Sequence, residues 1–258
     1  MALAVIPARM ASTRFPGKML ADRTGKPLIV HVLERARMAR SLSRVLVATD
    51  DERIRDAVHA AGGHALMTHA DHPNGTSRIA QVVRALIDAG DAGDADIVVN
   101  VQGDEPEIEP SVIDALVARL SDEAPESAGG APMATLASDF APGEDPDDPN
   151  VVKLVLTASG HALYFSRARV PYVRDAADRD RAAGLCLKHP GLYAYRRDFL
   201  LRYVTLAPTP LEQAEKLEQL RVLEHGVRIA VARVACRHQG IDTPEQYDAF
   251  VRRHRAAR

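Results

Sequence analysis

The sequence predicts an α/β fold with a mostly parallel central sheet flanked by helices. In the first half of the chain, short apolar runs alternate with amphipathic segments, which is typical of parallel strands connected by helices. The 258 residues are 46% apolar and 26% charged, as is ordinary for a globular protein of this size. We therefore expect a single domain over residues 1–258.

The first half of the chain supplies most of the sheet. Ile29, Val32, Leu33 and Ala36 recur at three- and four-residue spacing, which indicates one buried helix face. Pro27 suits the first turn of that helix. The strands expected here are Ala2–Ile6, Val45–Thr49, Ala65–Met67 and Ile97–Val101. The helices expected here are Leu28–Arg40, Glu52–Ala61 and Thr76–Ala89.

The second half is less regular and ends in two helices. One long helix is expected over Pro210–His225, because Leu211, Leu217 and Leu220 share a face. The last helix begins after Thr243, which together with Gln246 can form a capping box. The strands expected in this half are Met133–Ser138, Val152–Thr157, Leu192–Tyr195 and Val227–Val234.

Composition excludes several classes of protein. The formal net charge is -2, so no basic field favours nucleic acid. No apolar stretch approaches the roughly 20 residues that a membrane-spanning helix needs. Cys186 and Cys236 form no paired ligand motif and no disulfide framework, which favours a reducing, cytoplasmic location.

A cationic loop follows the first expected strand. It contains Arg9, Arg14 and Lys18 among small residues and Gly17, but it lacks GxGxxG and the Walker spacing. Ligands of open parallel sheets bind beyond the carboxyl ends of the strands, where such cations can hold a triphosphate. A basic surface loop is the alternative.

Two aspartates also follow apolar strands. Asp104 lies beyond Ile97–Val101 and is preceded by Gly103, and Asp242 precedes the last helix. Two carboxylates at two strand ends can share a magnesium ion. The alternatives are a turn residue for Asp104 and a favourable charge at the helix start for Asp242.

Two further polar segments have competing interpretations. Residues 72–78 precede a helix and can bind a base or an anion there, although a plain helix-start loop is the simpler reading. The acidic run 144–149 contains two prolines, so we expect a solvated loop rather than a metal site.

Together these segments resemble the sugar-acid cytidylyltransferases, and Ala11–Lys18 resembles the branch that uses 3-deoxy-manno-octulosonate (Kdo) rather than sialic acid. The resemblance covers nearly the whole chain. Its other motifs are Gly25–Ala36, Val47–Asp50, Asn100–Pro106, Ala162–Arg167, His189 with Gly191 and Tyr193, Leu217–Arg221 and Asp242–Glu245. Asn74 and Ser77 depart from the family pattern in the segment 72–78.

The resemblance implies a nucleotide-diphospho-sugar transferase (Rossmann-like) fold and a homodimer that transfers CMP from CTP to Kdo. The products would be CMP-Kdo, for lipopolysaccharide biosynthesis, and pyrophosphate, and the reaction would need Mg2+. CTP would bind mainly to residues 1–120, whereas the sugar and dimer surfaces would lie mainly within 133–235.

The resemblance also implies roles for individual residues. Catalysis would use Arg9, Lys18, Asp104 and Asp242, of which Asp104 and Asp242 would hold the metal. CTP would contact Ala8, Arg9, Ser12, Lys18, Thr76, Arg78 and Gln102. Kdo would contact Arg14, Gln102, Arg167, His189, Tyr193, Glu218 and Gln219.

Taken without the resemblance, several of these residues have simpler explanations. Glu218 and Gln219 would be solvent-exposed helix positions, Tyr193 a core residue and His189 a surface histidine. Three other functions are compatible with the α/β pattern: a transferase for sialic acid or a sugar phosphate, a nicotinamide dehydrogenase, and a non-catalytic nucleotide-binding protein. The missing GxGxxG argues against the dehydrogenase.

Overall fold

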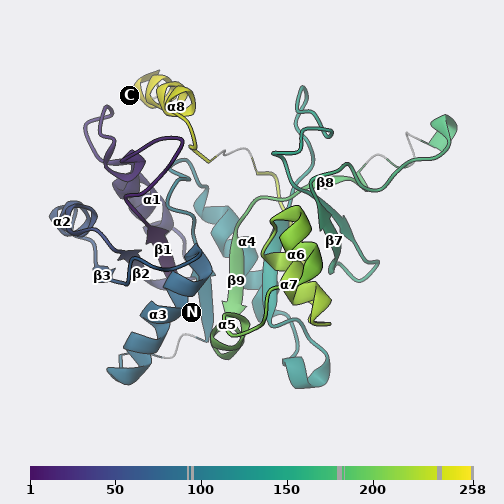
Figure 1. Cartoon of the computed structure of the whole chain (residues 1–258), viewed down its shortest axis with the longest axis horizontal. Helices are drawn as coiled ribbons and strands as arrows, with labels where there is room; N and C mark the ends of the chain where they lie inside the picture. Colours follow the sequence, from purple (N-terminus) through teal and green to yellow (C-terminus); the bar gives the residue numbers. More distant parts are fainter. Residues whose placement is uncertain (92, 94–95, 179–181, 183, 237–239, 257–258) are drawn as a thin grey trace. The chain divides into compact units, whose positions relative to one another are not determined.

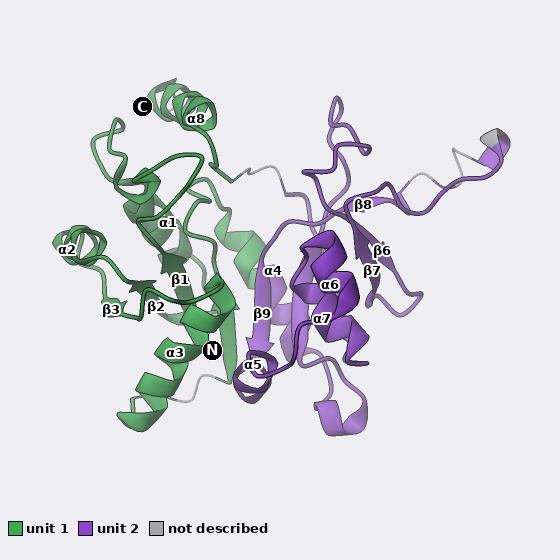
Figure 2. Ribbon diagram, viewed as in Figure 1, with its two compact units in different colours: residues 1–114, 238–258 green, residues 115–237 purple. Residues whose placement is uncertain are grey.

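The computed structural model describes residues 1–91, 93, 96–178, 182, 184–236 and 240–256. The chain forms two compact units (Figure 2). Unit 1 combines residues 1–114 with residues 238–258, and unit 2 consists of residues 115–237. Unit 2 is therefore an insertion between the two segments of unit 1 along the chain.

Unit 1 contains four parallel strands in the order β4-β1-β2-β3 (Figure 1). Their bounds are β1 Ala2–Ala8, β2 Leu42–Thr49, β3 Ala65–Met67 and β4 Ile97–Asn100. The helices of this unit are η1 Lys18–Leu20, α1 Leu28–Arg37, α2 Glu52–Ala60, α3 Gly75–Asp88 and α8 Pro244–Ala256. β1 is buried along almost its whole length, which explains why its sequence is continuously apolar.

The strand order of unit 1 defines where a ligand binds. The chain proceeds from β1 to β2 and β3 in one direction and then returns to place β4 on the other side of β1. With right-handed connections, this reversal puts α1 and α2 on one face and α3 on the other. The crevice at such a reversal, beyond the carboxyl ends of β1 and β4, is the usual ligand site of open α/β sheets.

Unit 2 contains two groups of strands. β5 Met133–Ala137 pairs in parallel with β10 Ile229–Arg233 and antiparallel with β9 Tyr193–Arg196. A separate antiparallel sheet has the order β7-β6-β8, with β6 Lys153–Leu156, β7 Ala162–Ser166 and β8 Leu187–Lys188. The helices of this unit are η2 Glu126–Ala128, η3 Ala176–Asp178, α5 Arg197–Tyr203, α6 Pro210–Glu215 and α7 Gln219–Glu224; α4 Pro110–Ser121 runs across the division at residue 114.

The α/β class with mostly parallel strands is confirmed, but one expected element is wrong. The predicted long helix Pro210–His225 is two short helices, α6 and α7. Lys216 between them adopts the left-handed conformation with φ 55°, which ends α6. The helices α4 and α5 were not predicted.

The helix α8 is anchored by the interactions that its sequence predicts. Thr243 Oγ1 accepts a hydrogen bond from the Gln246 backbone N–H, and Gln246 Oε1 accepts one from Thr243 N, which completes the expected capping box. Its apolar side packs Tyr247, Phe250 and Val251 with Leu28 and Ile241. Of the helices in the described ranges, none has the length and apolar character needed to cross a membrane.

We predict that Thr243→Ala lowers the free energy of unfolding of unit 1 by about 1 kcal/mol, because the first turn of α8 loses its cap. Urea unfolding monitored by circular dichroism measures this change. Thr13→Ala is the matched control, since Thr13 is exposed and its hydroxyl makes no hydrogen bond within the described residues. Equal stability of the two variants would contradict the assigned cap.

Candidate functional site

Lys18 is the centre of the candidate site in unit 1. Gly17, which precedes it in the left-handed conformation at φ 72°, turns the loop after β1 into η1. The Lys18 side chain is buried, and its Nζ donates to Asp104 Oδ2 at 2.7 Å, Ile241 O at 2.9 Å and Asp242 Oδ1 at 3.2 Å. These three acceptors match the three protons of the ammonium group.

Asp104 reaches Lys18 because the loop after β4 lies against the end of β1. A Cβ atom on Gly103 would be 2.8 Å from the Pro7 carbonyl oxygen, so glycine is required for this close approach. The Asp104 carbonyl accepts a hydrogen bond from Ile241 N at 2.8 Å. This bond joins the β4 loop to the segment that carries Asp242.

Asp242 is held from both sides. Its backbone N–H donates to Gln246 Oε1 at 2.6 Å, so the cap of α8 also fixes the aspartate. Its carboxylate pairs with Lys18 through Oδ1 and with the exposed Arg14 through Oδ2, at 3.0 Å from Arg14 Nη2. Asp104 and Asp242 thus lie on the same ammonium group, although Asp242 is not at the end of a strand, and the ion pair with Lys18 was not expected.

The donor atoms at this position suit a magnesium ion. Asp104 and Asp242 supply carboxylate oxygens, the hard ligands that Mg2+ prefers. Within the described ranges, no group of three or more His, Cys, Asp or Glu side chains could hold a metal. Two carboxylates are enough for Mg2+, because that ion usually completes its shell with substrate phosphates and water.

The cationic loop leaves one arginine available. Arg9 is exposed and makes no hydrogen bond or ion pair with any described residue. Ala8 is the buried last residue of β1, and Ser12 Oγ accepts a hydrogen bond from Phe15 N at 3.4 Å. Arg9 thus has its full set of donors for a phosphate, whereas those of Lys18 are already engaged.

The loop 72–78 lies beside the same end of β1. A Cβ atom on Gly75 would be 3.1 Å from Pro7 Cγ. Asn74 caps α3 through Ser77 N at 2.8 Å, so both departures from the family pattern serve the helix start. Thr76 is buried in the first turn.

Arg78 has a structural role in this conformation. Its buried guanidinium pairs with Asp50 Oδ2 at 2.9 Å and donates to Thr68 Oγ1. Asp50 and Thr68 follow β2 and β3, so Arg78 ties both strand ends to α3. Gln102, in the loop after β4, lies with its Nε2 3.5 Å from Asn100 Oδ1.

The expected sugar residues other than Arg14 and Gln102 lie in unit 2, where a chain of contacts connects them. Arg167 follows β7, in which Phe165 packs on His189 with ring centroids 4.9 Å apart. From His189 the ring contacts continue through Tyr193 and Tyr195 to Tyr203. The Tyr203 hydroxyl donates to Glu218 O at 2.7 Å, and Gln219 is the next residue.

His189 is neutral, and its tautomer follows from its neighbours. Burial lowers the pKa of His189 to about 3. The Thr135 hydroxyl gives its only proton to Leu192 O at 2.7 Å, so it must accept a hydrogen bond from His189 Nε2 at 2.9 Å. The proton therefore sits on Nε2, and Nδ1 is an acceptor with no hydrogen bond to a described residue. Such an acceptor suits a sugar hydroxyl.

Tyr193 and Gln219 are polar groups in apolar surroundings. Burial, and then the neighbouring Tyr195, raises the pKa of Tyr193 well above its ordinary value, so its phenol stays protonated. Gln219 is only 3% exposed, and its Nε2 has no hydrogen-bond partner in the described part of the chain. A buried unsatisfied donor is costly and is expected at a position where a ligand supplies the acceptor.

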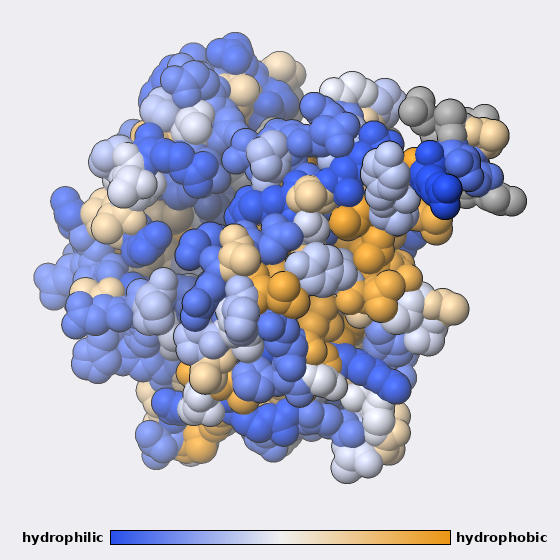
Figure 3. Space-filling view, turned by 45° about the vertical axis from the view of Figure 1, so that its right-hand side comes forward, coloured by the Kyte–Doolittle hydropathy of each residue, from blue (hydrophilic) through white to orange (hydrophobic). Residues whose placement is uncertain are grey.

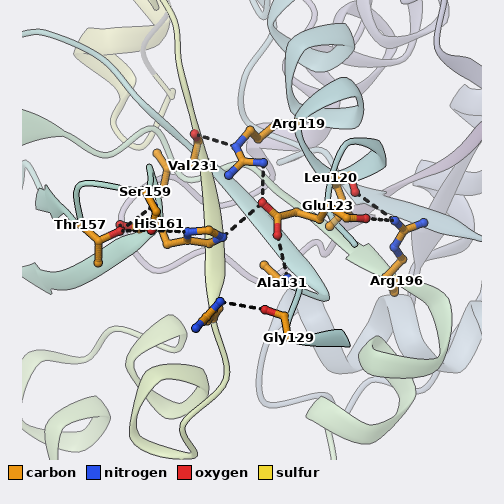
Figure 4. Close-up of polar contacts among 11 residues, drawn as sticks. Arg119, Leu120, Glu123, Gly129, Ala131, Thr157, Ser159, His161, Arg196 and Val231 are labelled. Atoms are coloured by element: carbon orange, nitrogen blue, oxygen red, sulfur yellow. Dashed lines mark hydrogen bonds and ion pairs between the residues drawn. The ribbon is translucent and has the colours of Figure 1, made fainter. Parts of the chain in front are cut away.

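A second polar cluster in unit 2 superficially resembles a nucleophilic triad (Figure 4). Ser159 Oγ lies 3.1 Å from His161 Nδ1, and His161 Nε2 lies 3.2 Å from Glu123 Oε1, outside hydrogen-bond geometry. Glu123 is already paired with Arg119 at 2.5 Å and accepts from Ala131 N at 2.9 Å. Burial alone would raise the pKa of Glu123, but these contacts outweigh it and lower the pKa. The cluster therefore stabilises the region around α4.

The acidic run 144–149 is a hydrogen-bonded loop. Glu144 pairs with Lys188 at 2.6 Å, and the carboxylates of Asp145 and Asp148 accept backbone N–H groups of their own turns. This arrangement agrees with the expected loop.

Comparison with known proteins identifies the family. A profile of the cytidylyltransferase family matches residues 3–229. A 3-deoxy-manno-octulosonate cytidylyltransferase of Geobacter metallireducens is 51% identical over 254 residues, which span 96% of this chain and 95% of the relative. The chain belongs to the 3-deoxy-manno-octulosonate cytidylyltransferases. The relative of the same name from Serratia proteamaculans is 49% identical, with 94% of each chain covered.

Solved structures agree with this family. A CMP:2-keto-3-deoxy-manno-octonic acid synthetase complexed with CTP matches with a TM-score of 0.87 and 40% identity, over 100% of this chain and 99% of the other. A 4-diphosphocytidyl-2C-methyl-D-erythritol synthase is only 15% identical, with a TM-score of 0.63 over 97% and 96% of the two chains, and shows the fold alone. The resemblance inferred from the motifs is thus confirmed, as is the transferase class of this cytidylyltransferase.

Sequence reasoning missed three groups that contact expected site residues: one beside Arg78, one beside Lys18 and one beside Arg167. Asp50 also follows a strand, so the strand-end rule that found Asp104 could have found it. The Ile241 carbonyl carries no sequence signal, because any residue has a carbonyl. Glu215, which contacts Arg167, had no signal while its helix was taken as continuous.

We predict that the neutral His189 makes unfolding depend on pH. Its folded pKa, about 3, lies below the unfolded value, so between these values the unfolded chain binds the extra proton. Stability contributed by the neutral ring is present above the unfolded pKa of roughly 6.5 and decreases as the pH falls, by at most about 1.4 kcal/mol per pH unit. The free energy of urea unfolding, measured between roughly pH 4.5 and 7, gives this dependence on pH. His189→Gln should remove this part of the slope, and an unchanged slope would contradict the assignment.

Proposed function

We propose that this chain transfers CMP from CTP to Kdo and releases pyrophosphate. The 2-hydroxyl oxygen of Kdo attacks the α-phosphorus in line and forms the new O–P bond. The bond from the α-phosphorus to the oxygen bridging to the β-phosphate breaks, and the hydroxyl proton is lost. The protein contributes positioning and charge neutralisation rather than a covalent intermediate.

The convergence of Lys18, Asp104 and Asp242 beyond β1 and β4 carries this proposal. It lies where the strand order reverses, and it combines cations for a triphosphate with carboxylates for a metal. Arg9 is available to neutralise phosphate charge, and the start of α3 offers N–H groups nearby. Kdo as the acceptor is supported by the names of relatives about 50% identical to the chain.

We further propose that Asp104 and Asp242 hold Mg2+. When bound, the ion lowers the pKa of a coordinated hydroxyl and neutralises phosphate charge. Lys18 shares both carboxylates in this structure and keeps them close together despite their like charges. With Mg2+ on these carboxylates, the Lys18 ammonium group would be available to a phosphate.

We assign the sugar acid mainly to the expected sugar residues of unit 2, which the contacts described above connect. Arg167 offers charge-assisted hydrogen bonds to a carboxylate, and His189 Nδ1 accepts from a hydroxyl. The Nε2 group of Gln219 donates to a further sugar oxygen. Glu218 and Tyr193 complete this set, and Arg14, Gln102, Ser12 and Thr76 remain proposed contacts in unit 1.

The test is pyrophosphate release with CTP and Mg2+, with Kdo, sialic acid or no acceptor supplied in parallel. Of these three reactions, we expect only the one with Kdo to release pyrophosphate, and we expect EDTA to abolish that release. Release with sialic acid would move the chain to another branch of the family. CTP binding without release, from folded protein, would favour the non-catalytic alternative.

We predict that Asp104→Asn lowers turnover about 100-fold or more, because a metal-binding charge is lost at the reacting phosphate. The protein should remain folded, since Lys18 keeps Asp242 and the Ile241 carbonyl as partners. Steady-state pyrophosphate release, with circular dichroism as the folding check, measures this. Asp88→Asn at the exposed end of α3 is the matched control, and similar rates for the two variants would exclude the metal role.

We also propose a homodimer in which unit 2 supplies the contact. Apolar side chains gather on the face of unit 2 shown in Figure 3. Unit 2 also has four large apolar or aromatic residues that are well exposed, namely Leu163 at 62%, Tyr172 at 88%, Leu185 at 54% and Leu211 at 40%. A patch of this kind indicates an interface, and a second copy is the partner that the family resemblance implies.

We predict that Leu163→Lys converts the dimer to a monomer, because it places a charge in the apolar contact. Light scattering coupled to size exclusion measures the mass. Met38→Lys in unit 1 is the matched control, since Met38 is also 62% exposed. A dimer that survives Leu163→Lys, or that Met38→Lys disrupts equally, would contradict this surface.

We propose a cytoplasmic location as well. CTP and Mg2+ are intracellular reagents, and no disulfide joins Cys186 and Cys236. The product would feed lipopolysaccharide biosynthesis.

A further inference from the structure

Arg167 is held in unit 2 mainly by one residue, Glu215. The two carboxylate oxygens of Glu215 accept from Ser166 Oγ at 2.8 Å and from Arg167 N at 2.9 Å. The Glu215 carbonyl accepts from Arg167 Nε at 2.7 Å. One residue thus fixes both the backbone and the guanidinium of Arg167.

The remaining contact of Arg167 decides which donors are left for a ligand. Nη1 donates to Pro149 O at 3.0 Å. The turn that contains Pro149 is held by the fully buried Lys153, whose Nζ donates to Asp148 O and Val151 O. A guanidinium has five N–H groups, so three remain, one on Nη1 and two on Nη2. Nη2 keeps both of its N–H groups, which offer charge-assisted hydrogen bonds to a carboxylate.

Glu215 can make these contacts because its helix ends there. Lys216 is the non-glycine residue of the described chain with a positive φ, 55°. The resulting turn exposes the Glu215 carbonyl, which a continuing helix would use for its own hydrogen bond. Backbone strain of this kind is found where a functional geometry requires it.

The corner between α6 and α7 is itself rigid. Arg221 forms a bidentate pair with Glu212 across the break, at 2.7 and 2.5 Å, with both side chains largely buried. Glu212 also caps α6 through Thr209 N. The corner therefore carries Glu215 on one side and Gln219 on the other in a fixed arrangement.

We propose that Glu215 is the positioning residue that presents the free edge of Arg167 to the carboxylate of the acidic sugar. The left-handed turn at Lys216 maintains this arrangement. The inference rests on the proposed function, because it takes the acceptor to be a sugar acid. Glu215 acts through Arg167 and does not itself touch the substrate.

The kinetic test compares Kdo with Kdo methyl ester, which lacks the carboxylate charge. Glu215→Ala should raise the KM for Kdo about tenfold or more, because the Arg167 backbone, which carries the guanidinium, loses the carboxylate that holds it. The KM for CTP and the inhibition constant of the methyl ester should stay within about twofold of wild type. Gln213→Ala, at an exposed position of α6, is the matched control and should change none of these three constants.

Two variants of Lys216 test the role of the left-handed turn. Lys216→Gly retains the left-handed conformation and should leave the KM for Kdo unchanged. Lys216→Val, a β-branched residue that opposes positive φ, should raise it in the manner of Glu215→Ala. An unchanged KM for Kdo in Glu215→Ala would overturn the proposal. So would a rise in the inhibition constant of the methyl ester as large as the rise in the KM for Kdo.

A measurement without turnover separates this inference from the proposed function. The Arg167 Nε–H resonance, assigned by its loss in Arg167→Lys, should exchange slowly with solvent in the wild type. In Lys216→Val, which disturbs the turn that presents the Glu215 carbonyl to Nε, its exchange should be at least about tenfold faster. Equal exchange in both would refute the positioning role even if Kdo is the substrate, whereas absence of turnover with Kdo in the wild type would refute the proposed function alone.

Discussion

The geometry of the site in unit 1 depends on one buried ammonium group. Lys18 Nζ joins the loop after β1, the loop after β4 and the segment before α8, which are brought together from widely separated parts of the sequence. Two carboxylates that would otherwise repel each other are held side by side by this cation. The Gly103 contact with β1 and the capping box of α8 then determine the backbone positions from which the carboxylates reach it.

The two units handle charge differently. Unit 1 places ionised groups at the strand ends, where a triphosphate and a divalent cation need them. Unit 2 offers a neutral histidine, a protonated phenol and a buried amide, and it adds one guanidinium, that of Arg167, and one carboxyl group, that of Glu218. This division matches the two proposed substrates, a highly charged nucleotide and a polyhydroxylated sugar that carries one carboxylate.

Much of unit 1 could be predicted from the sequence, because its strands are buried on both faces and its helices have clear apolar stripes. The strand-end rule located Asp104, whereas Asp242 lies well beyond the end of β10 and reaches Lys18 through the segment before α8. The break at Lys216 could not be predicted, since Leu217 and Leu220 after it are buried, as they would be in a continuous helix. The partners of Lys18 and Arg78 depend on tertiary contacts over long sequence separations, which no local pattern reports.

The insertion of unit 2 within unit 1 has a consequence for how the protein is made. The ribosome releases Lys18 and Asp104 early, and the whole of unit 2 follows before Ile241 and Asp242 emerge. Until then the nascent chain carries the cation and one carboxylate without their other partners. A functional site in unit 1 therefore arises only late in translation, after unit 2 has had time to fold.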